Sequence, residues 1–417
     1  MGGCEGAEVT GRQAVPLELP EPAAAAVELL PDAWREESLF AARLKAIEVA
    51  SYARTRNHLD GAVTGLSPWI AHGFAPVAQV VAWLARYRGL RAHHKLAYEF
   101  GWREYFQHVW ARLGEGILAD IHPGLPGVRY GRELPPAVLE ARTGLAPIDQ
   151  AVRTLYRSGY LHNHARMWLA SFLVHYAKVD WRVGADWMYA YLLDGDLASN
   201  HLSWQWVAAT FGRKPYLFNA ESVARFAPAE WQCAGSALDA DHATLDALAR
   251  SSGRILCGCR AGDPVAPPPA LACPPPALLE GVDGLLPTLA PGRTVMLVHP
   301  WHMRPPARRP DGAIVLGVVH LPFHRRFRWS SQRWHFVLPR LRKVCDRLFV
   351  GDASMLVSLL GRRRVIAERT MYPEYRELLL SLATELREPP RWLPDPPSLS
   401  PSFSHYWRRY GPEARKR

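Results

Sequence analysis

One stretch decides the fold: Asp194-Gly195-Asp196-Leu197-Ala198-Ser199-Asn200-His201-Leu202-Ser203-Trp204-Gln205-Trp206. It opens with two carboxylates around a glycine, which is typical of a turn that hydrogen-bonds to hydroxyl groups or pairs with an arginine. If a helix begins near Asn200, the side chains of Asn200 and Trp204 share one face, because residues four apart are neighbours on a helix. Taken alone, such a motif is more often an ordinary turn beside core tryptophans.

A second motif lies upstream: Leu161-His162-Asn163-His164-Ala165-Arg166-Met167. On a helix that follows Asn163, Arg166 and Met167 fall three and four residues further on, so one stripe presents an amide, a guanidinium and a thioether. This mixture is unusual for a core face, and it makes Arg166 a predicted partner of Asp194. Any one of these motifs in isolation is more often structural than functional.

The sequence around these motifs predicts an all-helical domain over 35–228, preceded by a flexible leader over 1–34. Apolar residues recur at three- and four-residue spacing, Pro, Gly and Asn separate the segments, and valine-rich alternating runs are scarce. The predicted helical segments are 77–87, 92–113, 148–156, 163–178 and 187–193.

The composition changes after this domain. Residues 229–290 contain two runs of three prolines, which indicate a Pro-rich linker with at most short helices. Short β-branched runs at 294–299, 313–320, 349–350 and 365–368 then alternate with helical patterns at 331–348, 355–360 and 374–386. This alternation predicts a small parallel α/β domain over 291–388. A Pro-rich and basic tail over 389–417 is expected to be loose.

Four motifs occur together: Trp102-Arg103-Glu104, the His-Asn-x-x-Arg-Met motif at 162–167, Asp180-Trp181-Arg182 and the opening stretch. Residues 52–219 resemble the FAD-binding helical domain of the DNA photolyase and cryptochrome family. Asn163 and Met167 are similar to the class I branch that acts on cyclobutane pyrimidine dimers. An amide at Asn200, where animal and plant cryptochromes commonly have aspartate, also favours a photolyase.

The resemblance implies a mainly α fold and a folded FAD cofactor in a bowl of helices. Arg166 would neutralise Asp194 beneath the flavin, and Asn200 would face its N5 atom. The cofactor-binding residues that the resemblance implies are Tyr52, Thr64, Gly65, Leu66, Ser67, Arg103, Asn163, Arg166, Asp194, Gly195, Asp196 and Asn200.

The resemblance also implies UV-damaged DNA as the partner and a deoxyribodipyrimidine photo-lyase, a carbon–carbon lyase driven by light, as the activity. Excited reduced flavin would give one electron to a flipped-out dimer, whose ring opens before the electron returns. The implied catalytic residues are Glu99, Asn163, Met167 and Asn200. The implied DNA and substrate residues are Arg56, Glu99, Trp102, Arg103, His164, Met167 and Trp206. A cryptochrome-like flavin photoreceptor and a non-repairing FAD-binding protein remain as alternatives.

Electron transfer to the flavin would run through Trp204 and Trp181 to Tyr130, which stands where the family has an outer tryptophan. Leu96 replaces an aromatic residue of the family. The usual N-terminal antenna domain is not found ahead of Tyr52. Residues 334–369 faintly resemble it, so the α/β domain is either an antenna-like domain in permuted order or an unrelated small domain.

The net charge of +11 is uneven, because residues 291–417 carry 24 basic and 10 acidic side chains, against 26 and 29 in residues 1–290. A basic region attracts nucleic acid, although a solvated arginine-rich surface explains it equally well. Few cysteines, short apolar runs and no secretory leader predict a cytoplasmic protein without a membrane segment, and we expect a monomer. The spacing of Cys233, Cys257, Cys259 and Cys273 fits no known ligand set, so no metal is predicted.

Overall fold

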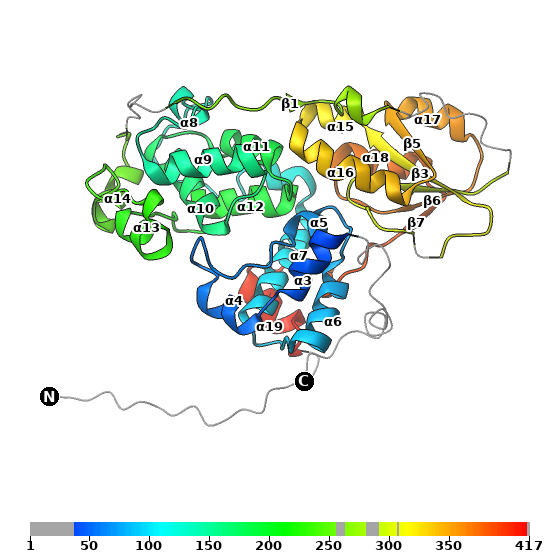
Figure 1. Cartoon of the computed structure of the whole chain (residues 1–417), viewed down its shortest axis with the longest axis horizontal. Coiled ribbons are helices and arrows are strands. Elements are labelled where there is room, and N and C mark those ends of the chain that lie inside the picture. The colour runs from blue at the N-terminus through cyan, green and yellow to red at the C-terminus, as the bar shows by residue number, and fades with distance from the viewer. Residues whose placement is uncertain (1–36, 256–262, 281–291, 307, 415–417) are drawn as a thin grey trace.

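The computed structural model describes residues 37–255, 263–280, 292–306 and 308–414. The predicted leader over 1–34 lies outside them. Figure 1 shows two groups of helices and, beside them, a sheet covered by further helices. The predicted fold class is confirmed: a mainly helical body is followed by a small α/β domain. None of the helices in these ranges is long and apolar enough to cross a membrane.

The first helical group is built around one long helix, α7. This helix contributes nine buried residues and carries the Trp-Arg-Glu motif. The glycine that follows α6, Gly89, has a φ of 64°, a left-handed conformation that ends helices. The elements of this group are α3 (Ser38–Lys45), α4 (Val49–Thr55), α5 (Ser67–Ala71), α6 (Val77–Arg88), α7 (Lys95–Leu113) and the 3₁₀ turn η1 (Gly114–Leu118).

The second group carries the remaining motifs. The predicted helix 163–178 is α-helical only to Ser171, where a π-helical turn follows, and the predicted helix 187–193 begins earlier because Asp180 caps it. The elements are α8 (Pro136–Leu139), α9 (Ala146–Ser158), α10 (Asn163–Ser171), η2 (Phe172–Tyr176), α11 (Trp181–Tyr191), α12 (Leu197–Ala208), α13 (Ala220–Phe226), η3 (Ala229–Trp231) and α14 (His242–Ala249).

The connection to the α/β domain runs along the edge of the helical body (Figure 1). It contains the two-residue strand β1 (Ala270–Leu271) and the 3₁₀ turn η4 (Pro276–Leu278). Strand β1 pairs antiparallel with β4 (Trp329–Ser330), which directly precedes helix α16 (Ser331–Val344). This short pairing ties the Pro-rich connection to the domain that it enters.

The α/β domain has a five-stranded, all-parallel sheet in the order β5-β3-β2-β6-β7. The chain starts at the centre, moves outward to β5, and then crosses back to β6. The predicted helix 374–386 ends at Leu382, and residues 385–387 form the edge strand instead. The elements are β2 (Val295–Val298), β3 (Ile314–His320), α15 (Leu321–Arg326), α16 (Ser331–Val344), β5 (Arg347–Gly351), α17 (Ala353–Leu360), β6 (Val365–Glu368), α18 (Pro373–Leu382) and β7 (Glu385–Arg387).

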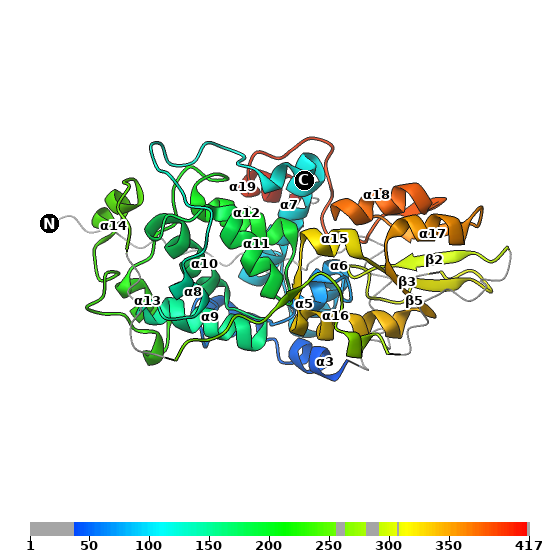
Figure 2. The ribbon, with the colours of Figure 1, turned by 90° about the horizontal axis from the view of Figure 1, so that it is seen from above.

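The C-terminal segment, residues 389–414, was expected to be loose, and this expectation is wrong. Its helix α19 (Phe403–Tyr410) packs against α7 in the first helical group, as Figures 1 and 2 both show. The segment is held because its aromatic and aliphatic side chains are buried, which outweighs its Pro-rich and basic composition. The residues that anchor it in the core are Trp392, Leu393, Phe403 and Tyr406.

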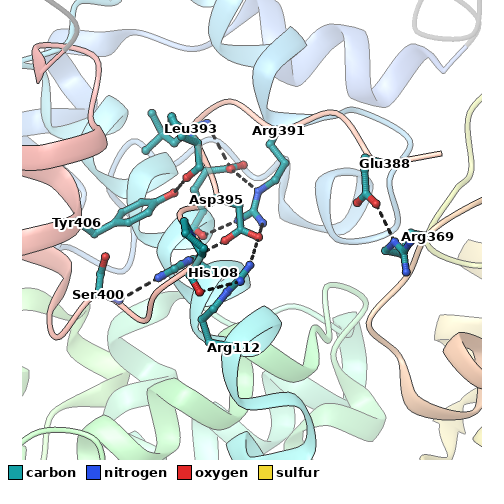
Figure 3. A network of polar contacts seen from close by, with 12 residues as sticks. His108, Arg112, Arg369, Glu388, Arg391, Leu393, Asp395, Ser400 and Tyr406 are labelled. Carbon is teal, nitrogen blue, oxygen red and sulfur yellow. Dashed lines mark hydrogen bonds and ion pairs between the residues drawn. The ribbon is translucent and has the colours of Figure 1, made fainter. Parts of the chain in front are cut away.

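Polar contacts also fix the C-terminal segment (Figure 3). His108 donates through Nδ1 to Asp395 at 2.7 Å and accepts through Nε2 from the Ser400 amide at 3.0 Å. One hydrophobic cluster joins the first helical group, the α/β domain and this segment. In sequence, the α/β domain therefore lies between two parts of the chain that pack on each other.

Candidate functional site

A cavity of about 430 Å³ lies among α7, α10, α11 and α12, and we refer to it as the helical cavity. The His-Asn-x-x-Arg-Met motif and the Asp-Gly-Asp motif meet there, although 28 residues separate Arg166 from Asp194. Most of the predicted site residues line it: Tyr52, Thr64, Ser67, Glu99, Trp102, Arg103, Asn163, Arg166, Met167, Asp194, Asp196, Asn200, Trp204 and Trp206.

The predicted pairing of Arg166 with Asp194 is confirmed. Arg166 Nη2 lies 2.8 Å from Asp194 Oδ2, and Arg166 Nε donates to the Leu161 carbonyl. Burial opposes ionisation of Asp194, but the guanidinium outweighs it and lowers the pKa of this carboxyl. Asp194 Oδ1 is buried without a hydrogen bond of good geometry in the described residues, although Ser67 lies near enough to lower the same pKa. One oxygen of this carboxylate is thus less well satisfied than the other.

Asp196 is engaged by more partners than the sequence indicated. Its Oδ1 caps α12 by accepting from the Ser199 amide at 2.8 Å. Gln107 Nε2 donates to both carboxylate oxygens at 3.0 Å, and the Tyr372 hydroxyl donates to Oδ2 at 3.2 Å. Arg103 Nη2 lies further away, at 3.5 Å. Sequence reasoning missed Gln107 and Tyr372, since neither belongs to a motif.

The α10 stripe is arranged as predicted, because Asn163 Nδ2 donates to Met167 Sδ at 3.3 Å. The N-terminus of α10 is fixed by His162, whose Nδ1 accepts from the His164 amide and whose Nε2 donates to the Arg56 carbonyl. Burial lowers the pKa of His162 to about 4, so it is neutral in this arrangement.

The predicted helix face that joins Asn200 and Trp204 is present on α12. Asn200 Nδ2 donates to the Ala185 carbonyl at 2.8 Å, which fixes the orientation of the amide. The Trp204 ring lies directly against Gly184, where an added Cβ would come within 2.3 Å of it. Because residue 184 is a glycine and has no side chain, there is room for the Trp204 ring between α11 and the helical cavity.

Trp181 and Tyr130 lie outside the helical cavity and line a separate cavity of about 240 Å³. Trp181 Nε1 donates to Asp120 Oδ1 at 2.7 Å. Burial, followed by the charges of Asp120 and Asp180, raises the pKa of Tyr130 to about 12. The Tyr130 phenol is consequently harder to deprotonate than that of an ordinary tyrosine.

Charged and aromatic residues form the rim of the helical cavity. Glu99 Oε1 lies 3.0 Å from Arg56 Nη1, and burial raises the Glu99 pKa despite this guanidinium. Trp206 is 40% exposed, which is high for a tryptophan. Trp102 stacks on Phe403 of α19, with ring centroids 4.0 Å apart and an interplanar angle of 16°. Phe403 was missed because it lies in the segment that we expected to be loose.

Besides Trp181 and Tyr130, five predicted site residues do not line the helical cavity: Arg56, Gly65, Leu66, His164 and Gly195. Gly65 has a φ of 60°, which favours glycine, and Leu66 is fully buried in the core. His164 contacts the Phe226 ring, and burial lowers its pKa to about 4.

Of the four cysteines considered for metal binding, Cys257 and Cys259 lie outside the described residues. Within the described ranges, no three His, Cys, Asp or Glu side chains are grouped as a metal site.

The helical part of the chain is similar to known proteins. Residues 96–229 match the family model described as the FAD binding domain of DNA photolyase. The deoxyribodipyrimidine photo-lyase of Streptomyces griseus is 31% identical over 217 residues, which cover 48% of this chain and 48% of the relative. The chloroplastic/mitochondrial cryptochrome DASH of Ostreococcus tauri is 34% identical over 181 residues, covering 41% of this chain and 33% of the relative.

Solved structures are similar over a comparable share of the chain. The cryptochrome of Synechocystis sp. PCC6803 has 26% identity and a TM-score of 0.42 over 46% of this chain and 43% of that chain. The chain spans about half or less of the length of the curated relatives named above. The predicted family resemblance and the predicted cofactor, FAD, are confirmed for this helical part of the molecule.

Proposed function

We propose that this chain, which contains a photolyase-type FAD-binding domain, is a light-driven enzyme that splits cyclobutane pyrimidine dimers in DNA, a deoxyribodipyrimidine photo-lyase. One observation carries the proposal: most of the implied cofactor residues and most of the implied lesion residues line one cavity. Asp194 and Arg166 stand at its floor, whereas Glu99, Trp102 and Trp206 stand at its rim. A cofactor and a flipped base would therefore be held side by side.

The helical cavity has the chemistry that a flavin requires. Its walls include apolar side chains such as Leu96 and Met188, and its floor has the buried Asp194 Oδ1 that lacks a well-formed hydrogen bond. Asn200 and Arg166 would hold the ring, and Thr64 and Ser67 would hold the phosphate side. When bound and reduced, FAD supplies a light-excited electron whose return after ring opening leaves no net oxidation or reduction.

The residues at the rim would select the lesion. Trp102 and Trp206 offer flat faces to the bases of an extruded dimer, and Glu99 and Asn163 would bind the base edges. Arg56 supplies positive charge toward the DNA backbone. Because His164 is neutral at neutral pH, it would contact a phosphate only as a hydrogen-bond donor.

The decisive experiment combines a spectrum with a repair assay. The purified chain is expected to show a flavin spectrum and to restore an oligonucleotide that carries one thymine dimer under blue light. Glu99→Ala and Met167→Ala should each reduce repair while the flavin content stays unchanged. Repair that is unaffected by both substitutions, or the absence of flavin after incubation with FAD, would contradict the proposal.

A flavin photoreceptor is the second candidate, because similar relatives include proteins named cryptochrome DASH. It is also compatible with Tyr130, which stands at the outer electron-transfer position. Under this alternative the chain would bind FAD and bleach in blue light with a reductant, but it would not repair the dimer. The same two measurements therefore separate the candidates.

We further propose that the α/β domain is an antenna-type domain placed after the helical domain instead of before it. Its doubly wound parallel sheet supports this proposal, since such sheets bind ligands where the strand order reverses. A cavity of about 660 Å³, here named the interdomain cavity, lies beside His299 and Thr370, at the carboxyl ends of β2 and β6. A second pigment released by denaturation of the native protein, in addition to FAD, would support this proposal.

A further inference from the structure

The turn that carries both flavin-site aspartates is held partly by the α/β domain. We define this aspartate turn as residues 193–196. Tyr372, directly before α18, donates to Asp196, and His72 Nε2 lies 3.0 Å from the Leu193 carbonyl. The third contact comes from Arg333 on α16, whose Nη2 donates to the Gly195 carbonyl. Two of these three contacts come from the α/β domain.

Arg333 is an unusual arginine because its side chain is completely buried. Among the described residues it forms no ion pair with a carboxylate, and its Nε has no hydrogen-bond partner. Its other contacts are the Tyr189 carbonyl at 2.9 Å and the rings of Tyr189 and Trp329, whose centroids lie 4.6 and 4.1 Å from Cζ. Buried charges are costly and are normally paired, so a guanidinium held by carbonyls and rings requires an explanation.

The position of Arg333 supplies the explanation. Tyr189 is near the C-terminal end of α11, where exposed carbonyls carry partial negative charge and attract cations. The guanidinium fork bridges this helix end to the carbonyl of Gly195, between the two aspartates. Gly195 itself leaves the necessary space, because an added Cβ would lie 2.4 Å from Arg333 Nη1. The turn and the arginine thus fit each other across the domain boundary.

We propose that Arg333 is a positioning residue for the FAD site, by which the α/β domain sets the geometry and charge of the aspartate turn. Asp194 and Asp196 already face Arg166 and Arg103, and Arg103 also faces Glu104, so Arg333 adds a further positive charge beside the turn. That charge favours an anionic ligand, and it favours reduced FAD over oxidised FAD because the reduced ring carries more negative charge. The proposal rests on FAD binding but not on DNA repair.

The test measures the affinity of the full-length apoprotein for oxidised and for reduced FAD. Arg333→Met should weaken binding of oxidised FAD by about tenfold, as expected for loss of a charged hydrogen bond, and weaken reduced FAD further. Arg333→Lys keeps the positive charge but loses the two-pronged hydrogen bonding of the guanidinium. Compared with Arg333→Met, it should therefore restore much of the preference for reduced FAD. The matched control is Arg340→Met on the same helix, because Arg340 pairs with Glu37 and does not contact the turn.

A second variant keeps the proposal testable if Arg333→Met does not fold. Gly195→Ala places a methyl group where the guanidinium lies, so it should weaken FAD binding from the opposite side of the contact. In the double variant the two effects should be smaller than additive. The inference would be overturned if Arg333→Met bound both forms of FAD with wild-type affinity. If Arg333→Met does not fold, wild-type affinity of Gly195→Ala for both forms would overturn it. A wild-type chain that binds no FAD would instead overturn the proposed function.

Discussion

The helical cavity and the interdomain cavity meet at Asp196 and differ in how their charges are paired. In the helical cavity, Asp194 keeps one oxygen without a well-formed hydrogen bond. In the interdomain cavity, Arg304 pairs with Glu368, Arg369 with Glu388 at 2.7 Å, and Arg391 with Asp395 at 3.2 Å. Figure 3 shows the last two pairs within the contacts of the C-terminal segment.

This difference separates two uses of polar groups. Charges that neutralise one another fix domains and segments in place, whereas a buried oxygen without a partner is costly unless a ligand completes it. Asp196 belongs to both cavities, because it caps α12 on one side and accepts from Tyr372 on the other. We therefore expect substitutions in the helical cavity to affect FAD binding, and those in the interdomain cavity to affect stability without affecting FAD binding.

The largest effect is expected at Asp194. Asp194→Asn would leave the Arg166 guanidinium without its partner, which costs about 3–5 kcal/mol where such a pair is buried, with the low end expected here because Arg166 is partly accessible. Bound FAD should be lost in the same variant. Denaturant unfolding and flavin absorbance measure the two effects. The control is Asp246→Asn in the exposed pair with Arg250, for which we expect less than about 1 kcal/mol.

Glu104 provides the converse test in the interdomain cavity. This buried carboxylate accepts from the Leu393 amide at 3.4 Å and lies 3.5 Å from Arg391, so it holds the C-terminal segment to α7. Glu104→Gln should lower the free energy of unfolding by about 1–3 kcal/mol. The dissociation constant for FAD should stay within about twofold of wild type. A large loss of FAD affinity would remove the distinction between the cavities.

The contribution of a buried histidine to the pH dependence of stability should be similar at the two cavities. His162 caps α10 at the helical cavity, and His299 lines the interdomain cavity. In His162 and His299, Nε2 donates to a carbonyl and Nδ1 accepts an amide, and burial lowers each pKa to about 4. The unfolded chain takes up protons below about pH 6.5, but the native chain does not until about pH 4, so stability falls as pH drops through this window. His162→Gln and His299→Gln should each reduce the slope by up to about 1.4 kcal/mol per pH unit.

The FAD affinity of these two variants sharpens the comparison. His162 caps the helix that carries Arg166, so His162→Gln should also weaken FAD binding. His299 lines the interdomain cavity and not the helical cavity, so His299→Gln should leave FAD binding unchanged. Titration of the apoprotein with FAD at neutral pH measures both. Equal effects on FAD binding would contradict the assignment of the two cavities.

The smallest effect concerns Phe403, which backs Trp102 at the rim of the helical cavity. Phe403→Leu removes an aromatic stack worth about 0.5–1.5 kcal/mol. Binding of dimer-containing DNA should weaken by a few-fold, with FAD content unchanged. Phe403→Tyr should retain the stack, and Leu399→Ala at an exposed position serves as the control. If Trp102→Ala weakens lesion binding but Phe403→Leu does not, the stack has no role in recognition.

The parts of the site that the sequence predicted are those set by short-range helical spacing. Asn163, Arg166 and Met167 share a stripe because they follow one another on α10, and the charge of Arg166 pointed to Asp194. Gln107 and Tyr372 were not predicted because they reach Asp196 across 89 and 176 residues. No local pattern encodes such contacts, which depend on how the domains pack.

The fold was predicted well where elements are long and periodic. The three-residue strand β7 was merged with the preceding helix, because its identity depends on pairing with β6 rather than on its own residues. The C-terminal segment was misjudged from its prolines and charges. Its aromatic residues at 403, 406, 407 and 410 follow helical spacing, and this signal could have identified α19.

The packing of α19 on α7 has a consequence for synthesis of the chain. The Tyr105 hydroxyl of α7 donates to the carbonyl of Ser400, which lies 295 residues further on. At about 5–20 residues per second, a ribosome needs on the order of 15–60 seconds between these two residues. During that interval the aromatic face of α7 is not yet covered by α19. The nascent chain would therefore expose an apolar surface, to which chaperones can bind until translation is almost finished.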